Sequence, residues 1–193
     1  MNAPVKVAAD EVCEICMTPI GEQHPHLVDV HDRRLLCACR GCYLLFVPKG
    51  AAQGRYRAVG DRCAPLPPSL LSGPHWEALQ IPIGLAFFFH NSATNRIAAF
   101  YPGAGGATES ELSLDAWESL TREEPLIAAM EADVEAVLVY RRREGEAEAY
   151  VVPVDACYEL VAIVRMAWQG FDGGDAVRER IEAFFAGIRE RCA

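Results

Sequence analysis

Apolar and polar positions form two pairs of short runs in the second half of the chain. Residues 80–89 are a nearly continuous apolar run, a polar turn follows, and residues 96–101 are mostly apolar. This pattern predicts a β-hairpin, and its apolar character on both faces places it at the centre of a sheet. A second pair of runs, 134–140 and 150–154, flanks a charged turn and predicts two more strands.

Helical patterns separate and follow these strands. Helices are predicted over residues 112–120, capped by Ser113, over 124–131, over 155–168, and in a final C-terminal segment. The final helix has an apolar stripe that consists of Val177, Ile181, Phe184, Phe185 and Ile188. The pattern predicts an α+β fold, in which a mostly antiparallel sheet of about four strands is packed by helices on one face.

The segment 102–110, PGAGGATES, is predicted as a flexible loop. Its glycines lie between a strand and a helix, but the phosphate-binding patterns are absent and neighbouring acidic residues would repel a phosphate. Thr108, Glu109 and Glu111 are candidates for lining a pocket or contacting a partner.

The N-terminal part has short strands and clustered cysteines. Residues 27–30 and 35–39 predict a hairpin, 42–46 a short helix that ends before Pro48, and 55–59 a third strand. A proline-rich stretch then disfavours regular helix. We therefore predict three parts: a Cys-rich metal-binding module (1–63), a Pro-rich connection (64–79) and an acidic α+β domain (80–193).

Two C-x-x-C pairs define the candidate metal site. Cys13 and Cys16 form the first pair, and Cys39 and Cys42 form the second. Four thiolates match the tetrahedral sulfur site of zinc, and the hairpin between the pairs can bring them together. A knuckle, a hairpin and a helix carrying the last ligands is the plan of a zinc ribbon or treble clef. Because so small a module cannot be stable on apolar burial alone, bound metal is expected to contribute on the order of 10 kcal/mol or more.

Other side chains in this stretch are alternative ligands. Cys37 lies two residues before Cys39 on a strand, so it could replace a member of either pair. His24, His26 and His31 could also ligate, although histidines in a polar hairpin are more often solvated or support the ligands from outside.

The charge is unevenly distributed. The chain has a net charge of −9, and all of this excess lies after residue 65. An acidic surface of this kind disfavours nucleic acid as a partner, because Lys and Arg supply most of the affinity for phosphates. No apolar run is long enough to span a membrane. Eight cysteines, five of them clustered at metal-ligand spacing, indicate a reducing compartment, and we expect a cytoplasmic protein.

A catalytic role is the weaker alternative, and whether the chain is an enzyme stays open. Cys157 is predicted near the start of a helix, where the pKa of a thiol can be lowered, and His75 or His90 could serve as its base. Nothing in the spacing brings these residues together. A lone cysteine on a core helix is usually a small buried hydrophobe.

Several segments resemble an uncharacterised bacterial family whose genes lie among those of nickel-iron uptake hydrogenases. They are CEIC, HPHLVDV, LLCACRGCYLLF, GRYRAV, LQIPIGLAFFF, AFYPGAGGATESEL, VDACYELV and WQGFDGG, which together cover nearly the whole chain. The resemblance implies an accessory or maturation protein whose partner is a hydrogenase subunit or another maturation protein. It assigns no catalytic role to any residue.

Two functions therefore remain. The first is a zinc-binding accessory protein that acts by protein–protein interaction. The second is an electron-transfer protein that binds iron, as a rubredoxin-like centre or an iron-sulfur cluster.

Overall fold

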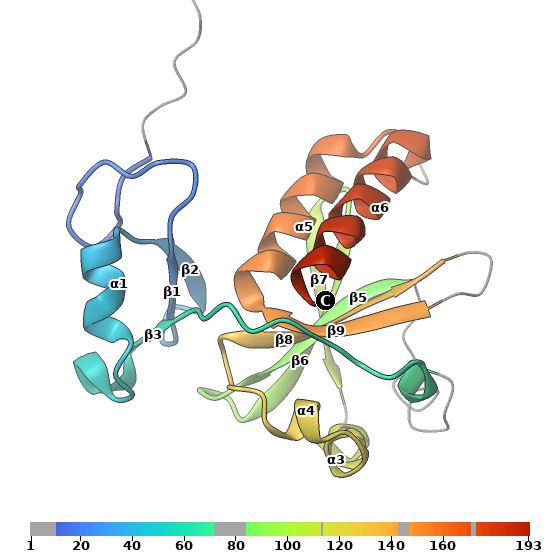
Figure 1. The fold of residues 1–193 in the computed structure, drawn as a ribbon, viewed down its shortest axis with the longest axis horizontal. Helices are drawn as coiled ribbons and strands as arrows, with labels where there is room; N and C mark the ends of the chain where they lie inside the picture. Colours follow the sequence, from blue (N-terminus) through green and yellow to red (C-terminus); the bar gives the residue numbers. More distant parts are fainter. Residues whose placement is uncertain (1–10, 72–83, 113, 143–146, 171–172) are drawn as a thin grey trace, which may run out of the picture. The chain divides into compact units, whose positions relative to one another are not determined.

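The computed structural model describes residues 11–71, 84–112, 114–142, 147–170 and 173–193. The chain divides into two compact units, Met1–Val59 and Gly60–Ala193. Each unit has its own sheet, so we describe them separately (Figure 1).

The first unit is built on a small antiparallel sheet with the strand order β2-β1-β3. Its elements are β1 (His26–Asp29), β2 (Arg34–Cys37), α1 (Arg40–Phe46), a 3-10 turn (Ala51–Gly54) and β3 (Tyr56–Ala58). The predicted hairpin, helix and third strand are confirmed, with boundaries that differ by at most two residues. The register sets His26 opposite Cys37 and Leu27 opposite Leu36.

The core of this unit contains few large apolar side chains. Leu27, Leu36 and Ala38 are buried together with two of the candidate metal ligands, Cys13 and Cys42. A core of this size cannot offset the conformational entropy of folding without further support. The cysteines are thus part of the unit's interior, and their state is coupled to its folding.

A buried carboxylate closes the β1–β2 turn. Asp29 is 2% exposed and accepts hydrogen bonds from the backbone N–H groups of His31 and Asp32, both at 3.1 Å. Arg55 donates to it from Nε at 3.1 Å and from Nη2 at 2.9 Å. Burial opposes the ionisation of Asp29, but these donors outweigh it and lower the pKa of its carboxyl below the ordinary value.

Replacing Asp29 by asparagine is expected to destabilise the first unit by about 1–3 kcal/mol, because charged hydrogen bonds are lost. A lowered carboxyl pKa gives stability that is present above the unfolded-state pKa and is lost as the pH falls through the folded-state pKa. The Asp29→Asn variant should lack this part of the acid dependence. The difference between the unfolding free energies of wild type and variant tests this, measured in urea at each pH from 7 down to the pH at which the metal is released, because acid release of the metal is common to both proteins.

Asp32→Asn is the matched control, since Asp32 contacts the same guanidinium at 3.1 Å but is about half exposed. We expect a change of less than about 1 kcal/mol for such an exposed pair. Equal losses of unfolding free energy in both variants would show that the burial of Asp29 does not increase its contribution to stability.

The second unit is built on a six-stranded antiparallel sheet with the order β4-β9-β8-β5-β6-β7. Its strands are β4 (Ala64–Pro65), β5 (Leu85–Asn91), β6 (Arg96–Gly103), β7 (Gly106–Leu112), β8 (Glu135–Arg141) and β9 (Ala147–Pro153). Its described helices are a 3-10 turn (Pro68–Leu71), α3 (Leu114–Glu123), α4 (Pro125–Ala128), α5 (Val154–Ala167) and α6 (Gly174–Arg191). The α+β class and the two central hairpins are confirmed.

The prediction of about four strands is wrong, because both edges of the sheet were missed. The segment predicted as a flexible loop forms the end of β6 and most of β7, joined by a tight turn in which Gly106 has a φ of 117°. Polar residues such as Thr108 and Glu109 suit a solvent-facing edge strand. At the other edge, β4 lies in the predicted Pro-rich connection. Pro65 is tolerated there because an edge strand can lack a backbone donor.

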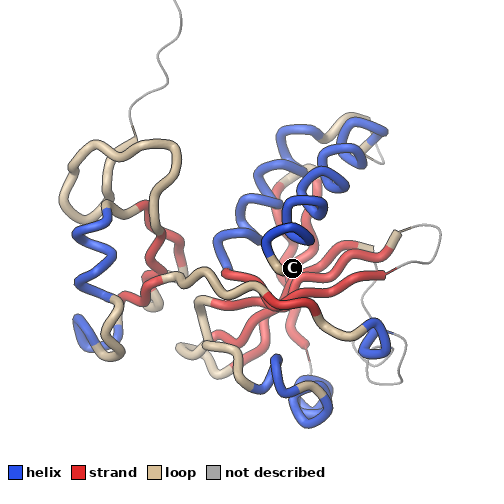
Figure 2. The backbone as a smooth tube through the Cα atoms, viewed as in Figure 1, coloured by secondary structure: helices blue, strands red, loops and turns tan. Residues whose placement is uncertain are grey.

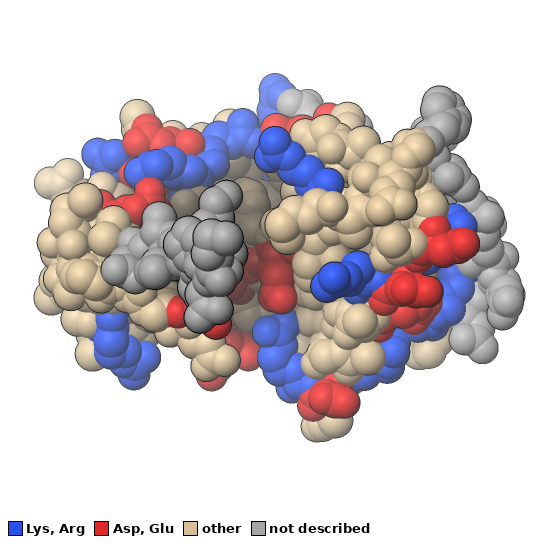
Figure 3. Space-filling view, turned by 90° about the horizontal axis from the view of Figure 1, so that it is seen from above, with Lys and Arg blue, Asp and Glu red and all other residues tan. Residues whose placement is uncertain are grey.

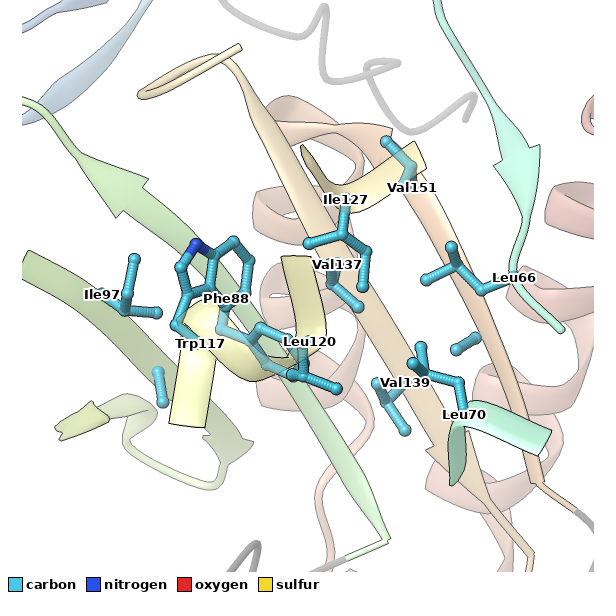
Figure 4. Close-up of a cluster of buried hydrophobic side chains, with 12 residues drawn as sticks. Leu66, Leu70, Phe88, Ile97, Trp117, Leu120, Ile127, Val137, Val139 and Val151 are labelled. Atoms are coloured by element: carbon cyan, nitrogen blue, oxygen red, sulfur yellow. The ribbon is translucent and has the colours of Figure 1, made fainter. Parts of the chain in front are cut away.

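Helices cover both faces of this sheet, not one face as predicted (Figures 1 and 2). The face toward α3 and α4 packs Trp117, Leu120 and Ile127 over Phe88 and Val137 (Figure 4). The Trp117 ring meets the Phe88 ring edge-on, with centroids 5.6 Å apart. The central strands are apolar on both faces because both faces are covered.

The opposite face packs against α5 and α6. Phe185 of α6 stacks on Tyr140 of β8 with a centroid distance of 4.7 Å. The predicted stripe of α6 is buried at Val177, Ile181, Phe185 and Ile188, while Phe184 is only partly buried. Ser113, the predicted cap of α3, lies outside the described residues.

Ion pairs connect α6 to the sheet. Arg142, in the turn between the predicted strands 134–140 and 150–154, donates to Glu182 at 2.8 Å and to Glu148 at 2.7 Å. Arg189 also donates to Glu148, at 2.8 Å. Over α5 and α6, acidic and basic side chains lie close together on the surface (Figure 3). The charges of Arg142 and Arg189 are thus balanced by nearby carboxylates.

A disulfide bond links two distant positions of the second unit. Cys63 and Cys192 are bonded at a sequence separation of 129, so the residue before β4 is tied to the end of α6. The cysteine spacing predicts a reducing compartment and no disulfide framework, so this bond departs from the expectation. The pairing joins positions at opposite ends of the unit, which no local sequence pattern signals.

Candidate metal centre

The first C-x-x-C pair lies in a tight turn, a knuckle formed by residues 13–18. The backbone N–H of Cys13 donates to the carbonyl of Thr18, and the N–H of Met17 donates to the carbonyl of Cys13, both at 2.8 Å. Met17 adopts a left-handed conformation with a φ of 63°. Such a backbone is unfavourable for a residue with a side chain, so the surrounding hydrogen bonds must hold it.

The second pair lies at the start of α1. Cys39 is the N-cap of this helix, and its Sγ accepts a hydrogen bond from the Cys42 N–H at 3.4 Å. Glu14 in the knuckle connects this region to the first pair: its N–H donates to the carbonyl of Cys37, and its carboxylate accepts from the Cys37 N–H. These two bonds, of 2.9 and 2.8 Å, hold the knuckle against the end of β2.

All four predicted cysteines converge. The Sγ atoms of Cys13, Cys16, Cys39 and Cys42 lie within 4.8 Å of one another. The Cys16 and Cys39 sulfurs are 3.7 Å apart. In a tetrahedral site with zinc–sulfur bonds of about 2.3 Å, neighbouring sulfurs are about 3.8 Å apart. The four sulfurs therefore fit a tetrahedral site around one metal ion. Both zinc and iron bind in such sites, and the metal is not identified.

The protonation of the thiols differs across the cluster. Hydrogen bonding from Thr18, whose side chain contributes more than its backbone, lowers the pKa of the Cys16 thiol to about 6. Burial opposes the ionisation of Cys13, but backbone donors, with that of Cys39 the strongest, lower the pKa of its thiol. Burial, helped by the neighbouring thiols, raises the pKa of Cys42 to about 12. Binding of a metal therefore has to release the Cys42 proton.

The remaining candidate ligands lie elsewhere in the unit. Cys37, predicted as a substitute ligand, is not part of the four-sulfur cluster but approaches His24 and His26. Burial, followed by the charge of Glu14, raises the pKa of the Cys37 thiol. His31 is exposed, and its Nδ1 lies 2.8 Å from the Asp32 carboxylate.

The second unit contains the other candidate residues. Thr108 and Glu109 lie exposed on the edge strand β7. Glu111 is on the same strand, but its side chain lies outside the described part of the chain. These residues follow one another along a strand, and their contact with a partner stays a prediction.

Cys157 does not have the properties of a nucleophile. It is fully buried in α5, and this burial raises the pKa of its thiol well above the ordinary value. His90, one of its two proposed bases, lies at the end of β5 with Nε2 2.9 Å from the Asn95 side chain. His75 lies outside the described residues. Cys157 instead belongs to the packing between α5 and the sheet.

Sequence reasoning missed two groupings of residues. One is the Cys63–Cys192 disulfide. The other is the approach of His24, His26 and Cys37, which were predicted only as alternative ligands for the ion of the four cysteines. A signal for the second existed, because residues 24 and 26 have the spacing of one strand face and Cys37 lies on the predicted return strand.

These features define a two-unit α+β protein with a candidate four-cysteine metal site in its smaller unit. Residues 12–192 match a family described as a family of unknown function (DUF5947), and the chain belongs to that family. No curated protein and no solved structure matches the chain. Among the described residues, no helix is both long enough and apolar enough to cross a membrane.

Proposed function

We propose that the protein is a zinc-binding accessory or maturation protein for a nickel-iron hydrogenase, and that it acts by protein–protein interaction. The observation that carries the metal part is the convergence of four thiols with a sulfur separation suited to a tetrahedral ion. All four positions are protein ligands. A closed site of this kind stabilises a fold and leaves no position open for a substrate.

The order of elements around the thiols supports a treble-clef or zinc-ribbon module. A knuckle supplies the first pair of sulfurs, a hairpin follows, and α1 carries Cys42 in its first turn. The metal would hold these parts together, and the partner would contact the surface that they form.

Exposed apolar side chains in the same unit support a docking role. Met17 in the knuckle is 66% exposed, and Leu44, Leu45 and Val47 in and after α1 are 50–65% exposed. Exposed large apolar side chains of this kind are typical of a contact surface. The hydrogenase setting itself comes from the resemblance of the sequence segments, and it defines the partner to be tested.

Co-expression of the tagged chain with the hydrogenase genes implied by the resemblance tests this partner. We expect a hydrogenase subunit or maturation protein to co-purify with the wild type, and to be lost with the double variant Leu44→Ser, Leu45→Ser. Met166→Ser is the matched control, because Met166 is 80% exposed but lies on α5 of the other unit. Recovery of the same partner with the double variant would exclude this surface.

An iron-binding electron-transfer protein is the second candidate. The exposed Cys16 sulfur favours it, because an iron held there would lie close to the surface where an electron donor could approach. Metal analysis and a visible spectrum of anaerobically purified protein separate the two candidates. Zinc protein is colourless, whereas ferric thiolate or an iron-sulfur cluster absorbs visible light.

The proposal includes the cytoplasm as the compartment. Metal-binding thiols require reducing conditions, and six of the eight cysteines are free in the structure. The single disulfide is compatible with this proposal only if it resists cellular reductants, and thermal unfolding with and without a reductant measures that resistance.

A further inference from the structure

His24, His26 and Cys37 form a second cluster of metal-binding side chains in the first unit. One ligand atom from each of the three lies within 4.8 Å of the others. We propose that this cluster binds a second divalent transition-metal ion of the zinc type, separate from the ion of the four cysteines, with three protein ligands and one open position.

The backbone places the three residues on one face of the β1–β2 hairpin. His26 and Cys37 are directly opposite each other in the antiparallel register. Residues at such positions have neighbouring side chains on the same face. His24 lies two residues before His26, and the bond from the Ala38 N–H to the Pro25 carbonyl extends the pairing of the two chains to this point. The His24 and His26 rings are 4.9 Å apart between centroids.

The buried imidazole of His24 is the observation that points to a ligand. Its side chain is only 8% exposed. Its Nε2 is buried and has no hydrogen-bond partner among the described residues. A buried polar atom without a partner is costly, and its presence in a folded protein calls for a missing group.

The other ring nitrogen of His24 determines what that group is. Nδ1 lies 2.8 Å from the carbonyl oxygen of Gly21, and the Glu11 carboxylate is 3.5 Å away. Because a carbonyl oxygen only accepts, Nδ1 carries the proton and Nε2 of the neutral ring has a free lone pair. A metal-binding histidine typically has this arrangement, in which an oxygen acceptor outside the site fixes the tautomer.

The donor set determines the class of ion. Two imidazoles and one thiolate suit zinc and related borderline ions, and disfavour calcium and magnesium, which prefer oxygen. Around a zinc ion the three ligand atoms would be about 3.3–3.6 Å apart. Small side-chain rotations can therefore bring the three ligand atoms from within 4.8 Å of one another to the separations of a zinc site. Three protein ligands leave a fourth position for water or a ligand from outside, unlike the closed four-sulfur site.

Titration of the metal-free, reduced full chain with Zn²⁺ alone tests the proposal, with bound metal counted after gel filtration. We expect two ions per chain. His24→Ala and His26→Ala should each reduce the count to one. Each should weaken metal affinity at the second site by more than about 100-fold, because loss of a residue that only supports a ligand already weakens affinity about 10- to 100-fold. His31→Ala is the matched control and should retain two ions, since His31 is an exposed histidine of the same hairpin outside the cluster.

Co²⁺ in place of Zn²⁺ identifies the site that is filled. A four-thiolate site gives strong sulfur-to-cobalt absorption, whereas a site with one thiolate adds a weak band that His24→Ala should remove. Wild-type protein that binds one ion, or histidine variants that keep two, would overturn the proposal. Loss of the four-sulfur ion alone, with the weak histidine-dependent band retained, would contradict the proposed function and leave this second site standing. Near-ultraviolet circular dichroism of each variant with one equivalent of Zn²⁺ shows whether the first unit is folded.

Discussion

Replacing Cys42 by serine is expected to abolish tight metal binding at the four-cysteine site and to unfold the first unit. Cys42 is 8% exposed and belongs to both the sulfur cluster and the small core of the unit. Structural zinc contributes about 10–16 kcal/mol to the folding of small modules. This is as large as the whole stability of an ordinary small domain, so little folded first unit should remain without it.

Metal analysis and limited proteolysis measure the two parts of this expectation. The segment 11–59 should become sensitive to protease, while the second unit, which has a separate core, should keep its own unfolding transition. Cys13→Ser should behave in the same way. Cys37→Ser is the matched control, because Cys37 lies outside the four-sulfur cluster: this variant should lose only the proposed second ion and keep the four-sulfur ion and the folded first unit. An unchanged ratio of the tightly bound ion in both Cys13→Ser and Cys42→Ser would remove these residues from the coordination shell.

Reduction of the Cys63–Cys192 disulfide is expected to lower the stability of the second unit by about 2–4 kcal/mol. The bond closes a loop with a sequence separation of 129, and long loops restrict the unfolded chain most. For a domain of this size such a loss lowers Tm by on the order of 10 °C. Complete unfolding is not expected, because the Arg62–Glu135 pair and the contacts of Arg189 with Glu148 hold the same ends.

Calorimetry with and without a phosphine reductant tests this second expectation. The double variant Cys63→Ser, Cys192→Ser should unfold at the lower temperature in both conditions. A wild-type protein with the same Tm in both conditions, and with eight free thiols by mass spectrometry, would show that the bond does not form in solution.

Local pattern was sufficient for the central part of each unit. The apolar runs over residues 80–89 and 134–140 predict the inner strands β5 and β8, because a strand covered on both faces has to be apolar throughout. The stripe of α6 predicts its buried face in the same way. The edges of the sheet were not predictable by this reasoning. An edge strand such as β7 is rich in polar residues, and its sequence resembles a loop until a partner strand supplies its hydrogen bonds.

The sequence by itself determined the candidate metal site, since four cysteines in two C-x-x-C pairs restrict their sulfurs to a common centre once a hairpin forms between them. Only the tertiary structure decided which other residues meet. The pairing of Cys63 with Cys192 depends on the sheet and α6 bringing distant positions together. The separation of Cys37 from the four-sulfur cluster depends on strand register, because a shift of one residue would turn its side chain to the opposite face.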